Sequence, residues 1–298
     1  PEGVGRMKPE ITLRTRLVML VIAATVPLFG LSLVGAVLTA NDAVTQTSTN
    51  LEFSASLVAA NQQRVADSVR QVLVAVSNVP GVVEGKEPDC QRYFKTLTTE
   101  LLVYANVGVV GTDGYLRCHS VPNSPPGFAG DRPYFKAAMA TGNFVAGGYL
   151  LGRISGKPIM TFALPIQGPD GTVRAVVFAS MYLSEIARAT AASSLPPGGR
   201  VIVMDSDGVV LAANPEGSAG VGKLVAGESL RNAVKARDPC VFEDPDASGA
   251  RRIYAFRPST PSRDAPFFVA VSADRAEVLA PSRQRLALNF IALTLVAL

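Results

Sequence analysis

The segment ANVGVVGTDGYLRCHS, residues 105–120, has a counterpart later in the chain, RVIVMDSDGVVLAANP, residues 200–215. Each copy has an apolar run on either side of an Asp-Gly pair, which begins at Asp113 in the first copy and at Asp207 in the second. Asp-Gly between two such runs is typical of a tight hairpin turn. The two copies therefore predict two hairpins and an internal duplication.

The residues that follow each hairpin also share one plan. In the first copy PIMTFALPI and TVRAVVFASMYL flank a turn at Asp170-Gly171, and in the second RIYAFRP and APFFVAVSA flank a Pro-rich turn. A short helical segment closes each copy, SEIARATA in the first and DRAEVLAP in the second. The pattern predicts two small antiparallel α/β domains in tandem, joined near residues 193–199.

Residues 41–79 contain neither Gly nor Pro, and they predict one long helix that Pro80-Gly81 ends. Apolar residues recur along it every seven positions, at Val44, Leu51, Val58, Val65, Val72 and Val79. This stripe fits a helix packed on its own domain. It also fits weak pairing with a second subunit at the end that carries Ser48 and Gln62.

The composition of the 298-residue chain, 48% hydrophobic and 17% charged with a mean hydropathy of +0.27, excludes a disordered protein. Residues 17–38 carry no charge, and as a helix they would rise about 33 Å, enough to cross a membrane. Lys8, Arg14 and Arg16 precede this segment, so the positive-inside rule predicts a cytoplasmic N-terminus at residues 1–16.

A cleaved signal peptide is the alternative to this anchor. The apolar run exceeds the roughly 7–15 residues of a signal sequence and no A-x-A site closes it, which favours the anchor. A second apolar stretch, residues 286–298, reaches the end of the sequence and is too short to span a membrane. With Pro1 as first residue, this predicts a fragment whose continuation completes a second membrane helix, with the residues between the two helices outside the cytoplasm.

Charge and residue usage exclude several classes of function. The net charge of +4, without a run of Lys or Arg, argues against a nucleic-acid surface. A single histidine, His119, leaves little for metal binding or acid–base catalysis, and we interpret it as structural. GSAGVGKL resembles a phosphate-binding loop, but Leu224 replaces the hydroxyl that would bind magnesium. We therefore expect no catalytic residue, metal or cofactor.

Three cysteines would lie in an oxidising compartment. Cys90 is on a predicted helix and Cys118 on the second strand of the first hairpin, which makes them a disulfide candidate; two buried thiols are the alternative. Cys240 is left over, and the absence of CxxC spacing argues against zinc and thioredoxin-like sites.

GDRPYFKAAMATG, residues 130–142, predicts a short helix with Pro in its first turn and a closing Gly cap. The helix N-terminus carries partial positive charge, Arg132 offers a planar fork for a carboxylate, and Tyr134 adds a hydroxyl. The alternative is that Arg132 pairs with Asp131 or another carboxylate and that Tyr134 belongs to the core.

The next segment, FVAGGYLLGRISGKPIM, supplies Tyr149, Arg153 and Lys157. We expect these side chains to face the same cavity as Arg132. Solvation at the surface is the alternative, and it is the commoner fate of such cations.

The anchor, the long helix and DRPYFKAAMATGNFVAGGYLLGRISGKPIMTFALPIQGPDG together resemble the double Cache domain, the sensor region of bacterial transmembrane receptors. This resemblance implies an α/β (α+β) fold in which a long N-terminal helix precedes two tandem PAS-like (Cache) domains with antiparallel sheets, flanked by transmembrane helices. The expected parts are a cytoplasmic N-terminus (1–16), a transmembrane helix (17–38), a stalk helix (41–79), a membrane-distal domain (80–192), a membrane-proximal domain (196–280) and the start of a second transmembrane helix (286–298).

The resemblance also implies a ligand pocket in the membrane-distal domain, between its sheet and the Arg-Pro-Tyr-Phe segment. Amino-acid-binding members carry Trp-Tyr after this Arg and an acidic residue on the last strand, where this chain has Pro133 and Tyr182. The Arg-Pro-Tyr-Phe run is similar to that of C4-dicarboxylate sensor kinases, which favours a small organic anion. The predicted ligand-binding residues are Asp131, Arg132, Tyr134, Tyr149, Lys157 and Tyr182.

The predicted function is ligand sensing outside the cytoplasm for a receptor of the bacterial inner membrane, a sensor histidine kinase of a two-component system. A diguanylate cyclase or a chemoreceptor is the alternative output. A membrane-tethered enzyme would need a nucleophile and a base that the sequence does not offer, and an adhesive module would have no closed pocket. The expected partners are a small-molecule ligand, the membrane, a second copy of the chain in a homodimer, and a cytoplasmic response partner reached through an output domain.

Overall fold

The structure, a computed structural model, describes residues 13–83, 89–121, 127–191, 195–196, 198–260 and 266–297. Contacts divide the chain into two compact units. The helical unit holds helix α1 (Leu13–Ser77) as far as Thr47 and helix α7 (Arg275–Ala297). The sheet unit, Ser48–Asp274, holds the remainder of α1 and the other described elements. Most of the predicted cytoplasmic N-terminus and part of the predicted linker at 193–199 lie outside the described residues.

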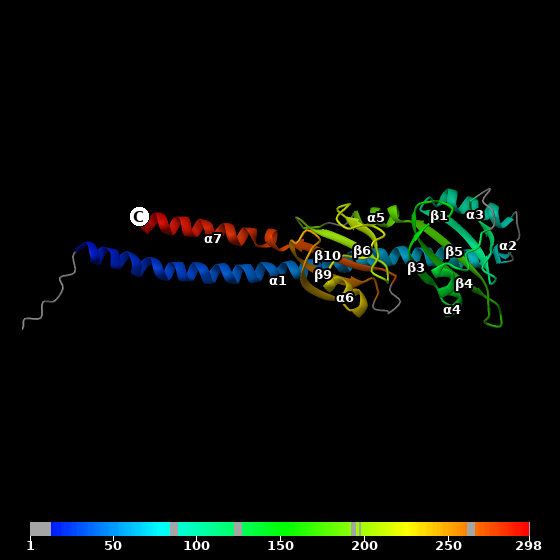
Figure 1. Ribbon diagram of the computed structural model, residues 1–298, viewed down its shortest axis with the longest axis horizontal. Coiled ribbons are helices and arrows are strands. Elements are labelled where there is room, and N and C mark those ends of the chain that lie inside the picture. Colours follow the sequence, from blue (N-terminus) through cyan, green and yellow to red (C-terminus); the bar gives the residue numbers. More distant parts are fainter. Residues whose placement is uncertain are drawn as a thin grey trace, which may run out of the picture. The chain divides into compact units, whose positions relative to one another are not determined.

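The first sheet has five antiparallel strands in the order β2–β1–β5–β4–β3 (Figure 1). Between the end of α1 and this sheet the chain forms two short helices, a third lies between β2 and β3, and a fourth follows β5. These elements are α2 (Pro80–Val83), α3 (Asp89–Glu100), β1 (Tyr104–Gly111), β2 (Leu116–His119), α4 (Pro133–Thr141), β3 (Val145–Leu151), β4 (Pro158–Gln167), β5 (Val173–Tyr182) and α5 (Leu183–Ala191).

The second sheet is antiparallel with the order β7–β6–β10–β9–β8, so it repeats the first strand for strand. Its elements are β6 (Arg200–Met204), β7 (Val210–Asn214), α6 (Glu228–Ala236), β8 (Cys240–Pro245), β9 (Arg251–Pro258) and β10 (Phe268–Asp274). Both predicted Asp-Gly hairpins are present. Gly114 and Gly208 have φ of +83° and +81°, a conformation that glycine adopts without a steric penalty.

Each sheet buries one face under a short helix. In the first sheet, Tyr134, Phe135 and Ala138 of α4 pack on Val176 and Phe178 of β5. In the second, one face of α6 packs on the aromatic side chains of β9 and β10, a cluster that includes Leu230, Ala233, Val234, Tyr254, Phe256 and Phe268. Fully burying one such large side chain is worth roughly 1.5–3 kcal/mol, so these clusters hold the helices in place.

The apolar stripe of α1 packs within the sheet unit. Leu51, Val58 and Val69 are buried there, each at most 2% exposed. The predicted end of this helix was wrong: α1 stops at Ser77, and Pro80 begins α2. Proline favours the first position of a helix and disfavours helical geometry in the residue before it, so it starts a new helix here.

Two predicted boundaries at the ends of the chain differ from the structure. The segments predicted as a transmembrane helix and a stalk helix form one continuous α1, and the helix passes through Pro27. The short helix predicted to close the second domain and the apolar segment 286–298 likewise form one helix, α7, which passes through Pro281.

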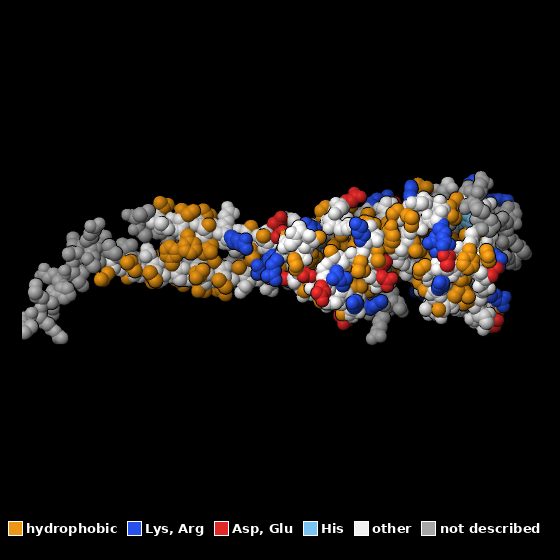
Figure 2. Space-filling view, in the orientation of Figure 1, with side chains coloured by type: hydrophobic (Ala, Val, Ile, Leu, Met, Phe, Trp, Pro, Cys, Tyr) orange, Lys and Arg blue, Asp and Glu red, His pale blue; other side chains and the backbone are white. Residues whose placement is uncertain are grey.

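Hydrophobic side chains cover much of the visible surface of the helical unit, over both α1 and α7 (Figure 2). Leu20, Val26 and Leu31 of α1 are each more than 60% exposed. By length and composition, one helix among the described residues, the Thr25–Ser77 part of α1, could cross a membrane. A signal sequence near an N-terminus would pass the same test.

Candidate ligand-binding site

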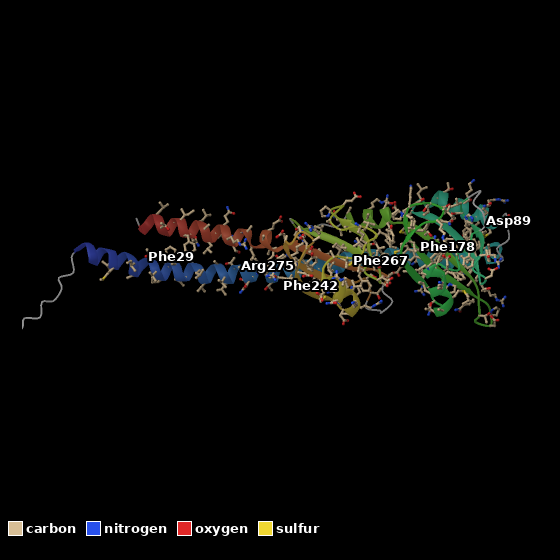
Figure 3. All side chains as sticks on the ribbon, in the orientation of Figure 1. Phe29, Asp89, Phe178, Phe242, Phe267 and Arg275 are labelled. Atoms are coloured by element: carbon tan, nitrogen blue, oxygen red, sulfur yellow. A yellow bond between two sulfur atoms is a disulfide. The ribbon has the colours of Figure 1, made fainter. Side chains whose placement is uncertain are left out.

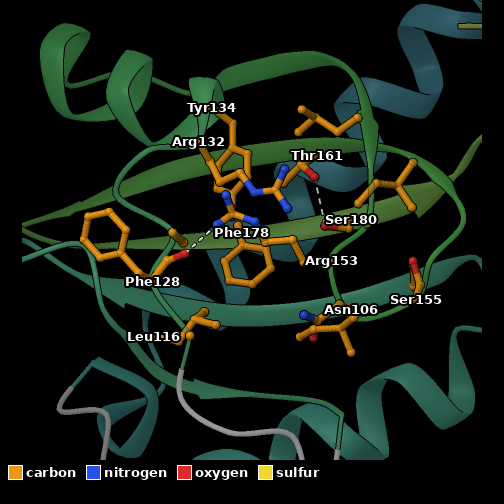
Figure 4. Close-up of a pocket in the computed structure, with 17 residues that line it drawn as sticks. Asn106, Leu116, Phe128, Arg132, Tyr134, Arg153, Ser155, Thr161, Phe178 and Ser180 are labelled. Atoms are coloured by element: carbon orange, nitrogen blue, oxygen red, sulfur yellow. Dashed lines mark hydrogen bonds between the residues drawn. The ribbon is translucent and has the colours of Figure 1, made fainter.

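A cavity of about 110 Å³ lies in the first sheet of the sheet unit (Figure 4). Its walls come from strands β1, β4 and β5, from the loop that leads into α4, and from the β3–β4 hairpin. The lining residues are mostly apolar, with a few polar groups and two arginines. The lining includes Asn106, Phe128, Arg132, Tyr134, Arg153, Thr161, Phe178 and Ser180.

Helix α4 brings Arg132 and Tyr134 to this cavity. Arg132 occupies the N-cap position with extended backbone (φ −70°, ψ 136°), and Pro133 starts the helix, as predicted. At the other end, Gly142 adopts the left-handed conformation (φ 66°) and its N–H donates to the carbonyl of Ala138, also as predicted. The cavity therefore receives both the guanidinium of Arg132 and the positive end of a helix dipole.

Asp131 forms an ion pair with Arg153 and not with Arg132. Arg153 Nη1 donates to Asp131 Oδ1 at 3.0 Å and to the Phe128 carbonyl at 2.8 Å, and Nη2 donates to Asp131 Oδ2. The hydrogen bond from Arg153 lowers the pKa of the Asp131 carboxyl. Both side chains are about half exposed, so water screens the pair and it adds little to the stability of the fold. It does neutralise Arg153 and join the β3–β4 hairpin to the loop before α4.

Within the described part of the chain, no carboxylate lies within ion-pair distance of Arg132. The alternative in which Arg132 pairs with Asp131 is therefore wrong. Arg132 is half-buried on the wall of the cavity.

Tyr134 belongs to the core and also lines the cavity. It is 6% exposed, and its ring centroid lies 5.7 Å from that of Phe178. Burial raises the pKa of Tyr134 to about 12, although the nearby charges of Arg132 and Arg153 act to lower it. The hydroxyl is thus protonated at neutral pH and can donate a hydrogen bond to a ligand.

Polar side chains on three neighbouring strands complete the lining. Thr161 and Ser180 are buried, and their hydroxyl oxygens lie 2.9 Å apart. Asn106 is 9% exposed, and its side-chain oxygen accepts a hydrogen bond of 3.0 Å from the Ser120 hydroxyl. Because that oxygen is engaged, the amide NH₂ of Asn106 is the group left to donate to a ligand.

The other four predicted ligand residues are not among those that line this cavity. Tyr149 lies on β3, where its backbone N–H donates to Asp205. Lys157 and Tyr182 contact each other, with the Lys157 ammonium 5.4 Å from the centroid of the Tyr182 ring. Asp131 takes part in the site only through its pair with Arg153.

Sequence reasoning missed Asn106, Thr161 and Ser180. Each is a polar residue inside an otherwise apolar strand, and a buried polar side chain in such a strand is the signal that could have indicated them. The three strands are far apart in sequence and become neighbours only through the order β1–β5–β4. Their convergence could not be seen without the fold.

The structure joins Cys90 and Cys118 in a disulfide, with their Cα atoms 6.2 Å apart. This bond fastens α3 to β2, beside the first sheet. Cys240 is a free, half-buried thiol, and burial raises its pKa.

Among the described residues that line the cavity there is no carboxylate and no imidazole. Among the residues that the structure describes, no group of three or more His, Cys, Asp or Glu is arranged to hold a metal ion.

Comparison with solved structures identifies relatives of this fold. The extracellular domain of a proposed histidine kinase, rpHK1S-Z16, has a TM-score of 0.65 and 21% identity, with 79% of this chain and 98% of that chain covered. The ligand-binding domain of the Pseudomonas fluorescens chemoreceptor CtaA, in complex with L-isoleucine, has a TM-score of 0.62 and 16% identity, with 80% and 97% covered. The ligand-binding domain of the Pseudomonas aeruginosa PAO1 amino acid chemoreceptor PctC, in complex with GABA, has a TM-score of 0.58 and 18% identity. The match covers 76% of this chain and 100% of that chain.

At these identities the likeness shows the fold alone. No curated protein matches the chain. The model of one protein family, described as the Cache domain, matches residues 38–282. Since this match spans both sheets and the cavity, the chain belongs to the Cache domain family.

Proposed function

We propose that this chain is the extracytoplasmic sensor region of a bacterial transmembrane receptor, and that the cavity of the first sheet binds a small organic anion. The observation that carries the proposal is Arg132, a half-buried cation on the cavity wall with no carboxylate partner among the described residues. A cation in a mostly apolar cavity gains a charge-assisted hydrogen bond when an anion enters.

The volume of the cavity limits the size of the ligand. A cavity of about 150 Å³ accommodates benzene, and this one measures about 110 Å³. An acid of three to four carbons is of that size. Its carboxylate would bind Arg132, the Tyr134 hydroxyl and the amide of Asn106, with its carbon chain against Phe178.

The lining favours an acid without an amino group. An ammonium group needs a carboxylate or several acceptors, and no carboxylate is found among the described residues of the cavity lining. The CtaA and PctC complexes contain L-isoleucine and GABA, both of which carry a carboxylate and an amine. We expect this chain to share recognition of the carboxylate and to lack the site for the amine.

The receptor assignment rests on the family and on the two helices of the helical unit. Cache sensor domains of receptors are extracellular, and the rpHK1S-Z16 relative is the extracellular domain of a proposed histidine kinase. We place residues 17–38 across the bacterial inner membrane, with residues 1–16 in the cytoplasm and the sheets in the periplasm. The output is a histidine kinase that acts on a cytoplasmic response partner, with a chemoreceptor or a diguanylate cyclase as the alternative.

We assign the two sheets to tandem domains, a membrane-distal one at residues 80–192 and a membrane-proximal one at residues 196–280. The matching strand order of the sheets supports this division. The ligand then binds in the distal domain.

We also propose a homodimer formed through the outer face of α1. Phe53 and Leu57, one helical turn apart, are 71% and 52% exposed, although α1 buries its opposite face. A neighbouring copy would cover these side chains. Light scattering of the chain in detergent micelles tests this, and a monomer at tens of micromolar would contradict it.

The ligand class is tested by the thermal unfolding of the whole chain in detergent micelles. The sodium salts of acetate, propionate, pyruvate, malonate and succinate are compared with glycine, alanine and GABA. Propionamide, which has the shape of propionate without its charge, is the matched control. A ligand at about 100 times its Kd stabilises the folded state by about 2.7 kcal/mol, which raises the midpoint by several degrees.

We expect at least one short acid to raise the midpoint and its amide to leave it unchanged. If the amino acids alone raised the midpoint, the proposed ligand class would be wrong. If neither group did, the proposal of an organic-anion sensor would fail.

A further inference from the structure

The carboxylate of Asp205, at the turn between β6 and β7, joins the two sheets. Asp205 is only 2% exposed. Its Oδ1 accepts hydrogen bonds from the N–H groups of Asp207 (3.0 Å) and Val209 (2.9 Å) within its own turn. Its Oδ2 accepts a bond of 2.9 Å from the N–H of Tyr149, on strand β3 of the first sheet.

The backbone hydrogen bonds of this turn do not depend on the carboxylate. At the equivalent turn of the first sheet, Gly111 occupies the position that Asp205 has in the second. The backbone bonds are the same: Gly111 N–H donates to the carbonyl of Tyr115, and Asp205 N–H to that of Val209. With glycine at this position the first turn keeps the same backbone bonds, and the N–H of Tyr115, which corresponds to Val209, donates to Asp113 instead. The side chain of Asp205 therefore adds two things, the bonds within its own turn and the contact with β3.

The two partners approach as closely as their backbones permit. A Cβ atom on Gly148 would lie 2.5 Å from Asp205 Oδ2, which real Cβ atoms do not tolerate. A Cβ on Gly222, in the loop after β7, would lie 2.7 Å from Cζ of the Tyr149 ring. Gly148 and Gly222 therefore allow Tyr149 to be held by the second domain through both its N–H and its ring.

Strand β3 is an edge strand, and its pairing with β4 is interrupted between Ala146 and Tyr149. The Tyr149 N–H is thus available for a partner outside the sheet. Further contacts accompany this bond: the ring of Phe162, on β4, lies 6.4 Å from that of Phe267, which Figure 3 shows where the two sheets meet.

The strand held by Asp205 leads directly into the cavity wall. Leu150 follows Tyr149, and the hairpin from Gly152 to Ser155 lines the cavity and carries Arg153. We propose that Asp205 is a positioning residue that locks the β3–β4 hairpin of the cavity to the second sheet, so that displacement of the hairpin moves the second sheet.

Burial raises the pKa of the Asp205 carboxyl, while the bonds from Tyr149, Val209 and Asp207 act to lower it. Ionisation of Asp205 is therefore less favourable here than in water. The carboxylate of Asp205 is therefore buried although burial disfavours its ionisation, and this supports a role for it in the contact between the sheets.

Hydrogen exchange of the whole chain in detergent micelles tests the contact between Asp205 and Tyr149. The experiment uses no ligand, so a negative result for this contact is distinct from a negative result for the proposed function. In Asp205→Asn, the side-chain oxygen that remains still accepts both hydrogen bonds of the turn. The amide NH₂ then faces the N–H of Tyr149, and because both groups are donors, the bond to Tyr149 is lost. We expect exchange at the Tyr149 amide to rise at least about tenfold. Asp207→Asn, on the same turn, is the matched control, with a change below twofold. A rise of equal size in both variants, or no rise in Asp205→Asn, would overturn the proposal.

Asp205→Gly gives the second turn the residue that the first turn has at the equivalent position, Gly111. It provides the same test if Asp205→Asn does not fold. Gly148→Ala should raise exchange at Tyr149 in the wild-type background, because the new methyl group displaces the carboxylate. In the Asp205→Gly background it should add less than twofold, since nothing remains to displace. Independent, additive effects of the two substitutions would contradict the lock.

Discussion

Asn106 shows how one side chain can set the charge that the cavity accepts. Its oxygen is engaged by Ser120, so the amide presents a donor. Asn106→Asp has almost the same shape but would place a negative charge on the wall that now attracts an anion. We predict at least a tenfold loss of affinity for the best acid of the panel, measured by calorimetry.

Asn143→Asp, an exposed substitution in the loop after α4, is the control for this prediction and should leave the affinity unchanged. Unaltered affinity in Asn106→Asp would show that the anion binds elsewhere.

Asp246 gives the second sheet a dependence on pH. Although burial opposes ionisation, hydrogen bonds from the Ser248 hydroxyl and N–H, from Arg200 and from the Ala250 N–H lower the pKa of Asp246 to about 2. A lowered pKa stabilises the fold above the ordinary value near 4, and this stability is lost as the pH falls toward 2. From a shift of about two units, we predict a loss of about 2 kcal/mol over that range.

Urea unfolding of the chain at pH 4 and pH 2 measures this loss. It should shrink by about 2 kcal/mol in Asp246→Asn and persist in Asp238→Asn, an exposed control. A full pH dependence in Asp246→Asn would assign the loss to other carboxylates.

At the scale of elements, the disulfide between α3 and β2 is expected to stabilise the first sheet. It closes a loop with a sequence separation of 28 residues, for which chain entropy predicts about 3–4 kcal/mol. The paired substitution Cys90→Ser and Cys118→Ser should lower the free energy of unfolding by that amount in denaturant melts without reductant. Cys240→Ser is the control, and an equal loss in it would exclude the loop as the cause.

The elements that could be predicted from the sequence are those with local signals. Asp-Gly pairs fix the turns at Gly114 and Gly208, and Pro133 and Gly142 mark the ends of α4, because each acts on its own backbone. The end of α1 was predicted at Val79 rather than at Ser77, because the sequence places a helix breaker at Pro80 but does not show that a second helix begins there.

The cavity was predicted only in part, because several of its residues meet through contacts between segments that are distant in sequence. Arg132 and Tyr134 share one short segment, so a local motif indicates both. Asn106, Thr161 and Ser180 meet through strand pairing over long sequence separations. The partner of Asp131 likewise depends on the β3–β4 hairpin, which brings Arg153 to it.

At the scale of the whole molecule, the sheet unit joins a cavity in one sheet to a second sheet that repeats its strand order. A ligand changes the output of such a receptor only through a difference in its affinity for two conformations. Coupling energies of about 1–3 kcal/mol are enough to change output several-fold. The contact of Asp205 with Tyr149 is one place where such a difference could act, because it joins the cavity hairpin to the second sheet.

The measurement that most directly tests the anion site is calorimetric titration of the chain, in detergent micelles, with the acid that stabilises it most. The wild-type chain is compared with Arg132→Ala and with Arg174→Ala, an exposed arginine outside the cavity lining. We predict that Arg132→Ala weakens binding at least about thirtyfold, in line with roughly 2 kcal/mol for a charge-assisted hydrogen bond, and that Arg174→Ala has no effect. Equal affinity of the wild-type chain and Arg132→Ala would contradict an anion site at this arginine.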